Sequence, residues 1–199
     1  MNQNPTKSLK QIILVTGPSR SGKSEWAEVL AMQTGKLVTY VATAQADKND
    51  TEWLSRINKH QQRRPKSWKT LLVPVELTAA ILSYSEGNCC LLVDSLGTWV
   101  ANLLEQEEEV WEKTVQEFLH SLVQTTATVV LVAEEVGWGV VPAYPLGRLF
   151  RDRFGTLVRQ VGIMANPVYL VTGGHILNLS ALGQTLPDYP RLNREIPPK

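Results

Sequence analysis

The order of apolar and polar residues along the chain predicts strands that alternate with helices. Short apolar runs have the length of strands, and longer segments between them carry apolar residues at helical spacing. The strand-like runs are apolar throughout, which favours a mostly parallel sheet covered on both faces. Strands are predicted at Ile12–Val15, Leu37–Ala42, Lys69–Val73, Cys89–Val93, Thr128–Ala133 and Val168–Val171. Helices are predicted at Lys23–Thr34, Thr51–Arg63, Leu77–Tyr84, Thr98–Leu104, Val110–Gln124 and Leu146–Met164.

This alternation predicts a single α/β domain. A chain of 199 residues can bury one sizeable core but is short for two. We expect the domain at residues 11–179, with an N-terminal tail at 1–10 and a proline-containing C-terminal tail at 180–199. In such a sheet, ligands bind beyond the carboxyl ends of the strands. The loops to examine therefore follow Val15, Ala42, Val93, Ala133 and Val171.

One of these loops matches the phosphate-binding pattern G-x-x-x-x-G-K-[ST]. It reads Gly17-Pro18-Ser19-Arg20-Ser21-Gly22-Lys23-Ser24 and lies between a predicted strand and a predicted helix. Glycine lets backbone N–H groups close around a polyphosphate, Lys23 can reach its outer phosphates, and Ser24 is the expected Mg²⁺ ligand. A chance Gly/Ser turn is disfavoured by the flanking elements. The loop predicts a nucleoside triphosphate site and a P-loop NTPase-like (RecA-like) fold, but kinases, ATPases and GTPases all share it.

A carboxylate follows another apolar run, in Leu91-Leu92-Val93-Asp94. Mg²⁺ is a hard cation that prefers oxygen ligands, and phosphate-loop enzymes hold it with an aspartate at the end of a strand. Asp94 is therefore the second predicted Mg²⁺ ligand. The alternative is an ordinary polar residue that ends a strand.

The segment Asp50–Pro65 combines a predicted helix with basic side chains. Arg56, His60 and at least one of Arg63 and Arg64 fall on one helical face. This arrangement suits the binding of phosphates. The alternative is a solvated basic face with an ordinary surface histidine.

The overall charge narrows the function classes. Lys plus Arg number 20 and Asp plus Glu number 19, so the net charge of +1 provides no field for nucleic acid or an anionic membrane. Apolar runs are too short for a membrane helix, and residues 1–10 lack a signal-peptide core. We expect a soluble cytoplasmic protein without nucleic-acid or membrane partners. Cys89 and Cys90 are adjacent on a predicted strand and should be buried and unpaired.

The motifs taken together resemble a known family. They are Ile-Leu-Val-Thr-Gly-x-x-Arg-Ser-Gly-Lys-Ser at 13–24, Tyr-Val-Ala-Thr-Ala at 40–44, Arg-Ile-x-x-His at 56–60, Leu-Val-Asp-Ser-Leu at 92–96 and Glu-Val-Gly-x-Gly-Val-Val-Pro at 135–142. In this order they resemble the bifunctional adenosylcobinamide kinases / adenosylcobinamide-phosphate guanylyltransferases of cobalamin biosynthesis. The resemblance extends from about Gln11 to Val171.

The resemblance implies two reactions. A nucleoside triphosphate, ATP or GTP, phosphorylates the aminopropanol hydroxyl of adenosylcobinamide with Mg²⁺ as cofactor. GTP then transfers GMP to adenosylcobinamide phosphate through a histidine, here His60, which gives adenosylcobinamide-GDP and pyrophosphate. By the same resemblance Lys23 serves catalysis, and the assembly is a homotrimer. Further nucleotide contacts are implied at Ala42, Thr43, Ala44, Gln61, Gln62, Arg63 and Arg64, for which loop and helix-end scaffolding is the alternative.

The chain departs from the family pattern in three places. Glu134 stands where members commonly have Asn, Val158-Arg159-Gln160 replaces a frequent Leu-Asn-Gln, and Leu72 stands where some relatives carry a carboxylate near the guanine site. These differences bear on base selectivity and leave Lys23 and His60 unchanged.

Other residues allow more than one interpretation. The loop 135–142 is a candidate substrate-side loop, and the helix begun by Arg148, Arg151 and Asp152 could face phosphates, a neighbouring subunit or solvent. His120 and His175 lack partners in the sequence and are interpreted as structural or surface residues. Two other functions stay open: a phosphate-loop transferase for another small molecule, and a nucleotide-driven switch in which Glu134 or Glu135 activates water.

Overall fold

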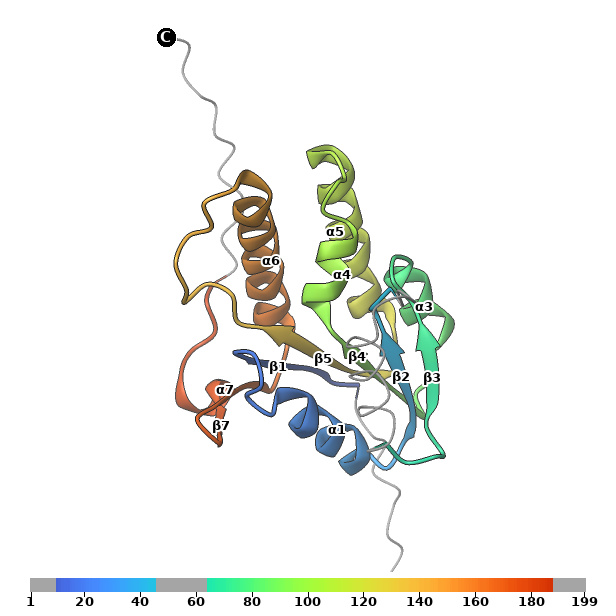
Figure 1. The fold of residues 1–199 in the computed structure, drawn as a ribbon. Coiled ribbons are helices and arrows are strands. Elements are labelled where there is room, and N and C mark those ends of the chain that lie inside the picture. The colour runs from blue at the N-terminus through green and yellow to red at the C-terminus, as the bar shows by residue number, and fades with distance from the viewer. Residues whose placement is uncertain (1–9, 46–63, 188–199) are drawn as a thin grey trace, which may run out of the picture.

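The computed structural model describes residues 10–45 and 64–187, which form one sheet with helices on both faces (Figure 1). The strands are β1 (Ile12–Gly17), β2 (Leu37–Ala42), β3 (Lys69–Leu72), β4 (Cys89–Asp94), β5 (Thr128–Glu134), β6 (Val168–Thr172) and β7 (His175–Asn178). The helices are α1 (Lys23–Gln33), α3 (Leu77–Ser83), α4 (Leu96–Asn102), α5 (Glu108–Gln124), α6 (Pro145–Met164) and α7 (Leu179–Leu182).

The strand order among the described residues is β3-β2-β4-β5-β1-β6-β7. All neighbours are parallel except β6 and β7, which are antiparallel. Gly17 pairs with Glu134 across β1 and β5, and Asp94 pairs with Ala42 across β4 and β2. The carboxyl ends of these four central strands therefore form one edge, where the phosphate loop, Glu134 and Asp94 lie close together.

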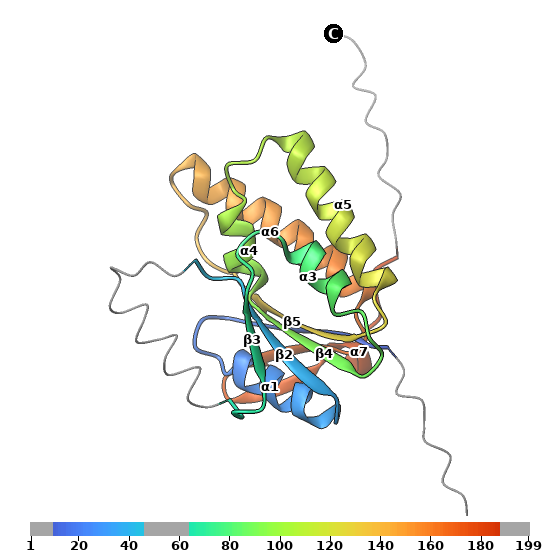
Figure 2. The same cartoon turned by 90° about the vertical axis from the view of Figure 1, so that its right-hand side faces the viewer.

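Helix α1 covers one face of the sheet, and α3, α4, α5 and α6 cover the other (Figures 1 and 2). The sheet residues facing the larger helical layer pack with buried aromatic side chains such as Trp99, Phe118 and Phe154. Those facing α1 form a second cluster that includes Val15, Ala27 and Leu92. Because both faces are buried, the strands are apolar throughout, and the predicted fold class is confirmed.

A buried arginine fixes the middle of α6 to the connection between α4 and α5. The Arg153 guanidinium donates to the carbonyls of Leu104 and Gln106 at 3.0 and 2.9 Å and forms an ion pair with Glu108 at 2.9 Å. Its Cζ also lies 5.3 Å from the Trp111 ring centroid. These contacts hold α6 beside α4 at the carboxyl edge of the sheet.

Element boundaries differ from the prediction where local capping was overlooked. Helix α4 begins at Leu96 rather than Thr98, because Ser95 is its N-cap and accepts a 3.3 Å hydrogen bond from the Thr98 amide. Strand β3 ends at Leu72, although the Val73 amide still donates to the Ala42 carbonyl at 2.8 Å. The helix predicted at Thr51–Arg63 lies outside the described residues.

The sequence analysis missed the hairpin formed by β6 and β7. Gly173 and Gly174 connect the two strands with φ of 58° and 75°, and positive φ at both central residues is the geometry of a tight hairpin turn. Strand β7 begins at His175. The helix that follows, α7, was also missed. It continues beyond residue 179, where the domain was expected to end.

Both cysteines are buried and free, as predicted. Burial raises the pKa of the Cys90 thiol to about 11. This thiol therefore stays protonated near neutral pH and packs in the α1-side core.

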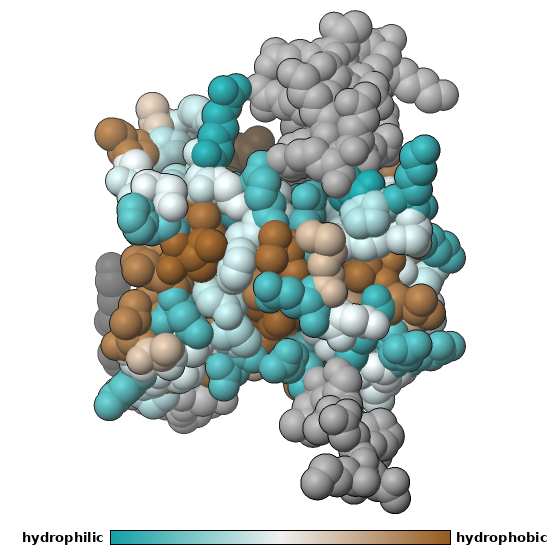
Figure 3. Space-filling model, turned by 90° about the horizontal axis from the view of Figure 1, so that it is seen from below, coloured by the Kyte–Doolittle hydropathy of each residue, from teal (hydrophilic) through white to brown (hydrophobic). Residues whose placement is uncertain are grey.

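In the view from below, the described residues form no extended apolar face (Figure 3). Hydrophobic residues form separate patches between hydrophilic ones on the part of this face where the structure describes the residues. Within the described ranges, no helix has the length and apolar character needed to span a membrane.

Candidate functional site

The phosphate loop connects the end of β1 to the start of α1. Its backbone has positive φ at Gly17 (158°), Arg20 (59°) and Gly22 (94°), and Gly22 is the N-cap of α1. A Cβ on Gly17 would overlap the backbone carbonyl of Val171, so the chain can turn here only with glycine. The loop therefore has the curved backbone and the helix N-terminus that bind a polyphosphate.

Three polar side chains at the loop, those of Thr16, Ser21 and Lys23, have buried atoms, whereas Ser19 and Arg20 are exposed. Lys23 is only 8% exposed, and its Nζ lies 3.4 Å from the Pro18 carbonyl, so the side chain folds back over the loop. The hydroxyls of Thr16 and Ser21 are enclosed and have no hydrogen-bond partner among the described residues. These groups can meet a bound phosphate, because buried polar atoms are normally paired. Ser24 occupies the first turn of α1.

Asp94 is held by Tyr40 from the neighbouring strand. The Tyr40 hydroxyl donates a 3.0 Å hydrogen bond to Oδ2 of Asp94. Burial, and then the charge of Asp94, raise the pKa of Tyr40, so the hydroxyl keeps its proton and remains a donor. One carboxylate oxygen is thus oriented by the protein, which leaves the other for a ligand.

Arg64 stacks on the ring of Tyr40. Its Cζ lies 3.5 Å from the centroid of the Tyr40 ring, well inside the range of a cation–π contact. Arg64 lies near the end of the segment Asp50–Pro65, which also carries His60. Tyr40 therefore contacts both this end of the segment and Asp94.

Thr43 supports the turn that carries Asp94. It is completely buried, and its Oγ1 donates to the Ser95 carbonyl at 2.7 Å and accepts from the Ser95 amide at 3.0 Å. Asn102 donates from Nδ2 to the Thr43 carbonyl at 2.8 Å. The turn over Ala42, Thr43 and Ala44 thus lies beside Asp94, where a nucleotide contact was predicted.

Several predicted site residues fall outside the described part of the chain. These are His60, Gln61, Gln62 and Arg63. Their roles remain predictions, and Arg64 is the described residue nearest to them.

Ser24 and Asp94 have the chemistry expected of Mg²⁺ ligands. They supply a hydroxyl and a carboxylate oxygen at the carboxyl edge, and Mg²⁺ is usually bound by few protein oxygens together with phosphates and water. Among the described residues, no group of three or more His, Cys, Asp or Glu side chains could form an all-protein metal site. The residues present therefore fit Mg²⁺ that is brought by a nucleotide.

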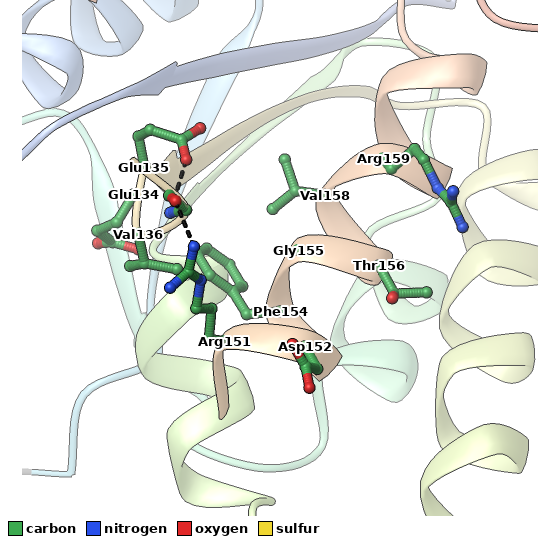
Figure 4. Close-up of a pocket in the computed structure, with 11 residues that line it drawn as sticks. Glu134, Glu135, Val136, Arg151, Asp152, Phe154, Gly155, Thr156, Val158 and Arg159 are labelled. Carbon is green, nitrogen blue, oxygen red and sulfur yellow. Dashed lines mark hydrogen bonds between the residues drawn. The ribbon is translucent and has the colours of Figure 1, made fainter. Parts of the chain in front are cut away.

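A cavity of about 590 Å³ opens between the β5–α6 loop and α6 (Figure 4). Arg151 reaches from α6 toward the loop and donates to the Gly137 carbonyl at 2.6 Å, whereas Arg159 extends away from the loop. Arg148 donates to the carbonyls of Pro142 and Ala143 at 3.0 and 2.7 Å. The two arginines Arg148 and Arg151 therefore hold the loop against α6.

The sequence analysis did not assign a role to Tyr40, although it lies in a quoted motif. Tyr40 and Asp94 become neighbours only because β2 pairs with β4, with Ala42 opposite Asp94. The sequence did hold one signal for Tyr40, which is a polar residue two positions before the end of an apolar strand. His120 is exposed on α5, and exposed His175 contacts only its own turn through the Gly173 carbonyl.

We expect Tyr40→Phe to lower the free energy of unfolding by about 1.5 kcal/mol, because it removes a hydrogen bond to a charged carboxylate. Urea unfolding would measure the change. Tyr144→Phe is the matched control, since Tyr144 is 65% exposed. Equal stabilities of the two variants would contradict the assigned Tyr40–Asp94 bond.

The family of this chain is shown by its similarity to known proteins. The sequence model described as "Cobinamide kinase / cobinamide phosphate guanyltransferase" matches residues 13–179, which is most of the chain. The chain belongs to this family. It is similar to the bifunctional adenosylcobalamin biosynthesis protein CobP of Pseudomonas aeruginosa, with 38% identity over 81% of this chain and 92% of that protein.

Two further proteins are similar to this member of the cobinamide kinase / cobinamide phosphate guanyltransferase family. The bifunctional adenosylcobalamin biosynthesis protein CobU of Escherichia coli is 37% identical over 82% of this chain and 96% of that protein. Among solved structures, the flagellar accessory protein FlaH of Methanocaldococcus jannaschii matches with 15% identity and a TM-score of 0.47, over 84% of this chain and 75% of that one.

Proposed function

We propose that this protein catalyses two successive transfers to one corrinoid acceptor. In the first, the γ-phosphoryl group of ATP or GTP passes to the aminopropanol hydroxyl of adenosylcobinamide. In the second, GMP from GTP passes to the resulting adenosylcobinamide phosphate, and pyrophosphate leaves. The observation that carries the proposal is the family match over residues 13–179, which includes a phosphate loop folded for nucleotide binding.

Both transfers use the phosphate loop in this proposal. Backbone amides of Gly17–Ser24 bind the polyphosphate, and Lys23 neutralises negative charge on its outer phosphates. Ser24 and Asp94 would hold Mg²⁺, which offsets the charge of the triphosphate. Tyr40 keeps Asp94 oriented through its 3.0 Å hydrogen bond.

The second transfer proceeds through His60. An imidazole nitrogen attacks the α-phosphorus of GTP, a nitrogen–phosphorus bond forms, and the bond from the α-phosphorus to the pyrophosphate oxygen breaks. The phosphate of the acceptor then attacks the same phosphorus and releases His60. A neutral imidazole is a competent nucleophile near pH 7, since its ordinary pKa is about 6.5.

The position of Arg64 supports this role. Arg64 stacks on Tyr40, whose hydroxyl contacts Asp94. The four-residue connection from Arg64 to His60 can extend at most about 14 Å. A chain of this length would allow His60 to reach the edge of the sheet that carries the phosphate loop.

Labelling with GTP that is radioactive at the α-phosphate tests the proposal. We expect label to remain on the protein after denaturation, to be labile in acid and stable in base, and to be discharged by adenosylcobinamide phosphate. GTP labelled at the γ-phosphate is the control, because it should leave no label on the protein. A wild-type protein that hydrolyses GTP but never retains the α-label would refute the guanylyl transfer.

We also propose, from the family resemblance, a homotrimer in the cytoplasm. The β5–α6 region exposes large apolar side chains, with Trp138 at 66%, Val140 at 96% and Tyr144 at 65% exposure, and such exposed groups favour a protein contact. Light scattering should give about three times 22.2 kDa. A monomer mass at micromolar concentration would contradict the trimer, and recovery in the membrane fraction would contradict the location.

A further inference from the structure

Two residues that line the cavity beside α6, Glu134 and Glu135, neighbour Gly17 at the start of the phosphate loop. Strand β5 lies between β1 and β4, so Glu134 at its end lies between the strand of the phosphate loop and the strand that ends in Asp94. The Glu135 amide donates to the carbonyl of Gly17 at 2.9 Å. The cavity therefore shares the carboxyl edge of the sheet with the loop that would bind the nucleotide.

Two charged side chains that line the cavity each have an unsatisfied atom. Neither Oε2 of Glu134 nor Nη1 of Arg151 has a hydrogen-bond partner among the described residues, and both atoms are buried. Gly97 makes room for the carboxylate, because a Cβ there would overlap Oε2 of Glu134. Buried charged atoms without partners are costly. A hydroxyl group would offer a partner to Glu134, and a phosphate group would offer one to Arg151.

The rest of the cavity fits one part of a larger molecule. Its volume of about 590 Å³ is in the usual range for a small-molecule site. Val136, Phe154 and Val158 supply apolar contacts around the charged pair. Figure 4 shows these side chains between the β5–α6 loop and α6.

We propose that this cavity is the acceptor subsite for both transfers, an inference that rests on the proposed function. In the first transfer, the acceptor hydroxyl attacks the γ-phosphorus, its proton passes to the Glu134 carboxylate, and the nucleoside diphosphate leaves. In the second, Arg151 binds the phosphate monoester of the acceptor while that phosphate attacks the guanylylated histidine. Glu134 thus acts on adenosylcobinamide, which carries the hydroxyl, and Arg151 acts on adenosylcobinamide phosphate.

This division depends on a difference between the Glu134 carboxylate and a side-chain amide. Both side chains can accept a hydrogen bond from a hydroxyl, but only the carboxylate can take its proton. Glu134→Gln keeps the shape and the acceptor oxygen while it removes that capacity. The variant therefore separates proton transfer from positioning.

Three reactions measured on each variant test the proposal. They are phosphorylation of adenosylcobinamide, formation of guanylylated protein from GTP, and discharge of that protein by adenosylcobinamide phosphate. Glu134→Gln should lower kcat of the first reaction about 100-fold and leave the other two unchanged, since general-base catalysis contributes at least that much. Arg151→Gln should slow the discharge about 100-fold, and its formation of guanylylated protein should match the wild type.

Arg148→Gln is the matched control for Arg151→Gln. Both arginines lie on α6 and donate to carbonyls of the β5–α6 loop. If Arg148→Gln slows the discharge equally, loosening of the loop explains the effect and the subsite is refuted. Reduced labelling by GTP in Glu134→Gln or Arg151→Gln would mean that the cavity binds the nucleotide rather than the acceptor. This result would also overturn the proposal.

Different experimental results would refute the proposed function and the acceptor subsite. If the wild-type protein neither phosphorylates adenosylcobinamide nor becomes guanylylated, the proposed function is wrong. If the wild type performs all three reactions and both Glu134→Gln and Arg151→Gln equal it, the acceptor subsite alone is wrong. The crossed pattern, with each variant impaired on one acceptor only, supports the assignment.

Discussion

Lys23→Ala is expected to lower both the phosphorylation of adenosylcobinamide and the guanylylation of the protein about 1,000-fold. Lys23 lies at the start of α1 and folds over the loop that would bind the polyphosphate. The loss of one preorganised charge that stabilises the transition state costs about 10²–10³ in rate. Because both reactions use the same triphosphate, one substitution should impair both. Steady-state phosphorylation and GTP labelling of the same preparation would measure the two effects.

Lys36→Ala is the control for Lys23→Ala. The Lys36 Nζ donates to Oγ1 of Thr128 at 2.8 Å, at the opposite edge of the sheet from the phosphate loop. This variant should retain both reactions within about twofold, as is usual for a side chain remote from the site. If Lys23→Ala lost only the phosphorylation and became labelled normally by GTP, a single phosphate loop would not serve both transfers.

His60→Ala should abolish the guanylylated protein and leave the phosphorylation of adenosylcobinamide within about threefold of the wild type. The substitution removes the nucleophile of one transfer. The phosphate loop and Asp94, which serve the phosphorylation of adenosylcobinamide, stay unchanged. The α-labelled GTP experiment and a coupled phosphorylation assay would give the two rates.

The control for this variant is His120→Ala, because His120 is exposed on α5, away from the carboxyl edge of the sheet. It should be labelled by GTP as fully as the wild type. An equal loss of phosphorylation in His60→Ala would argue against separate groups for the two transfers. Label that persists in His60→Ala would move the nucleophile to another residue.

One phosphate loop serves two phosphorus atoms in this proposal because the attacking groups come from different parts of the chain. The hydroxyl acceptor reaches the γ-phosphorus from the cavity beside α6, which Glu134 lines. His60 reaches the α-phosphorus from the segment that ends at Arg64, beside Tyr40. The loop thus fixes the nucleotide, and the choice of phosphorus depends on which group attacks.

Local patterns in the sequence predicted most of the central elements. The apolar runs around Ile12–Gly17 and Cys89–Asp94 became buried parallel strands, and the glycine pattern predicted a loop whose Gly17 and Gly22 have positive φ. The hairpin at Gly173 and Gly174 was missed although its glycine pair was a usable local signal. The start of α4 was misplaced because the cap at Ser95 was not considered.

The sequence by itself determined the phosphate loop and the strand-ending Asp94, because each depends on residues that are close along the chain. Only the tertiary structure decided that Tyr40 holds Asp94, that Arg64 stacks on Tyr40, and that Glu134 lies between the loop and Asp94. These contacts follow from the order of strands in the sheet. Strand order is a long-range property, since parallel neighbours are joined by crossovers and pair with residues far away in sequence.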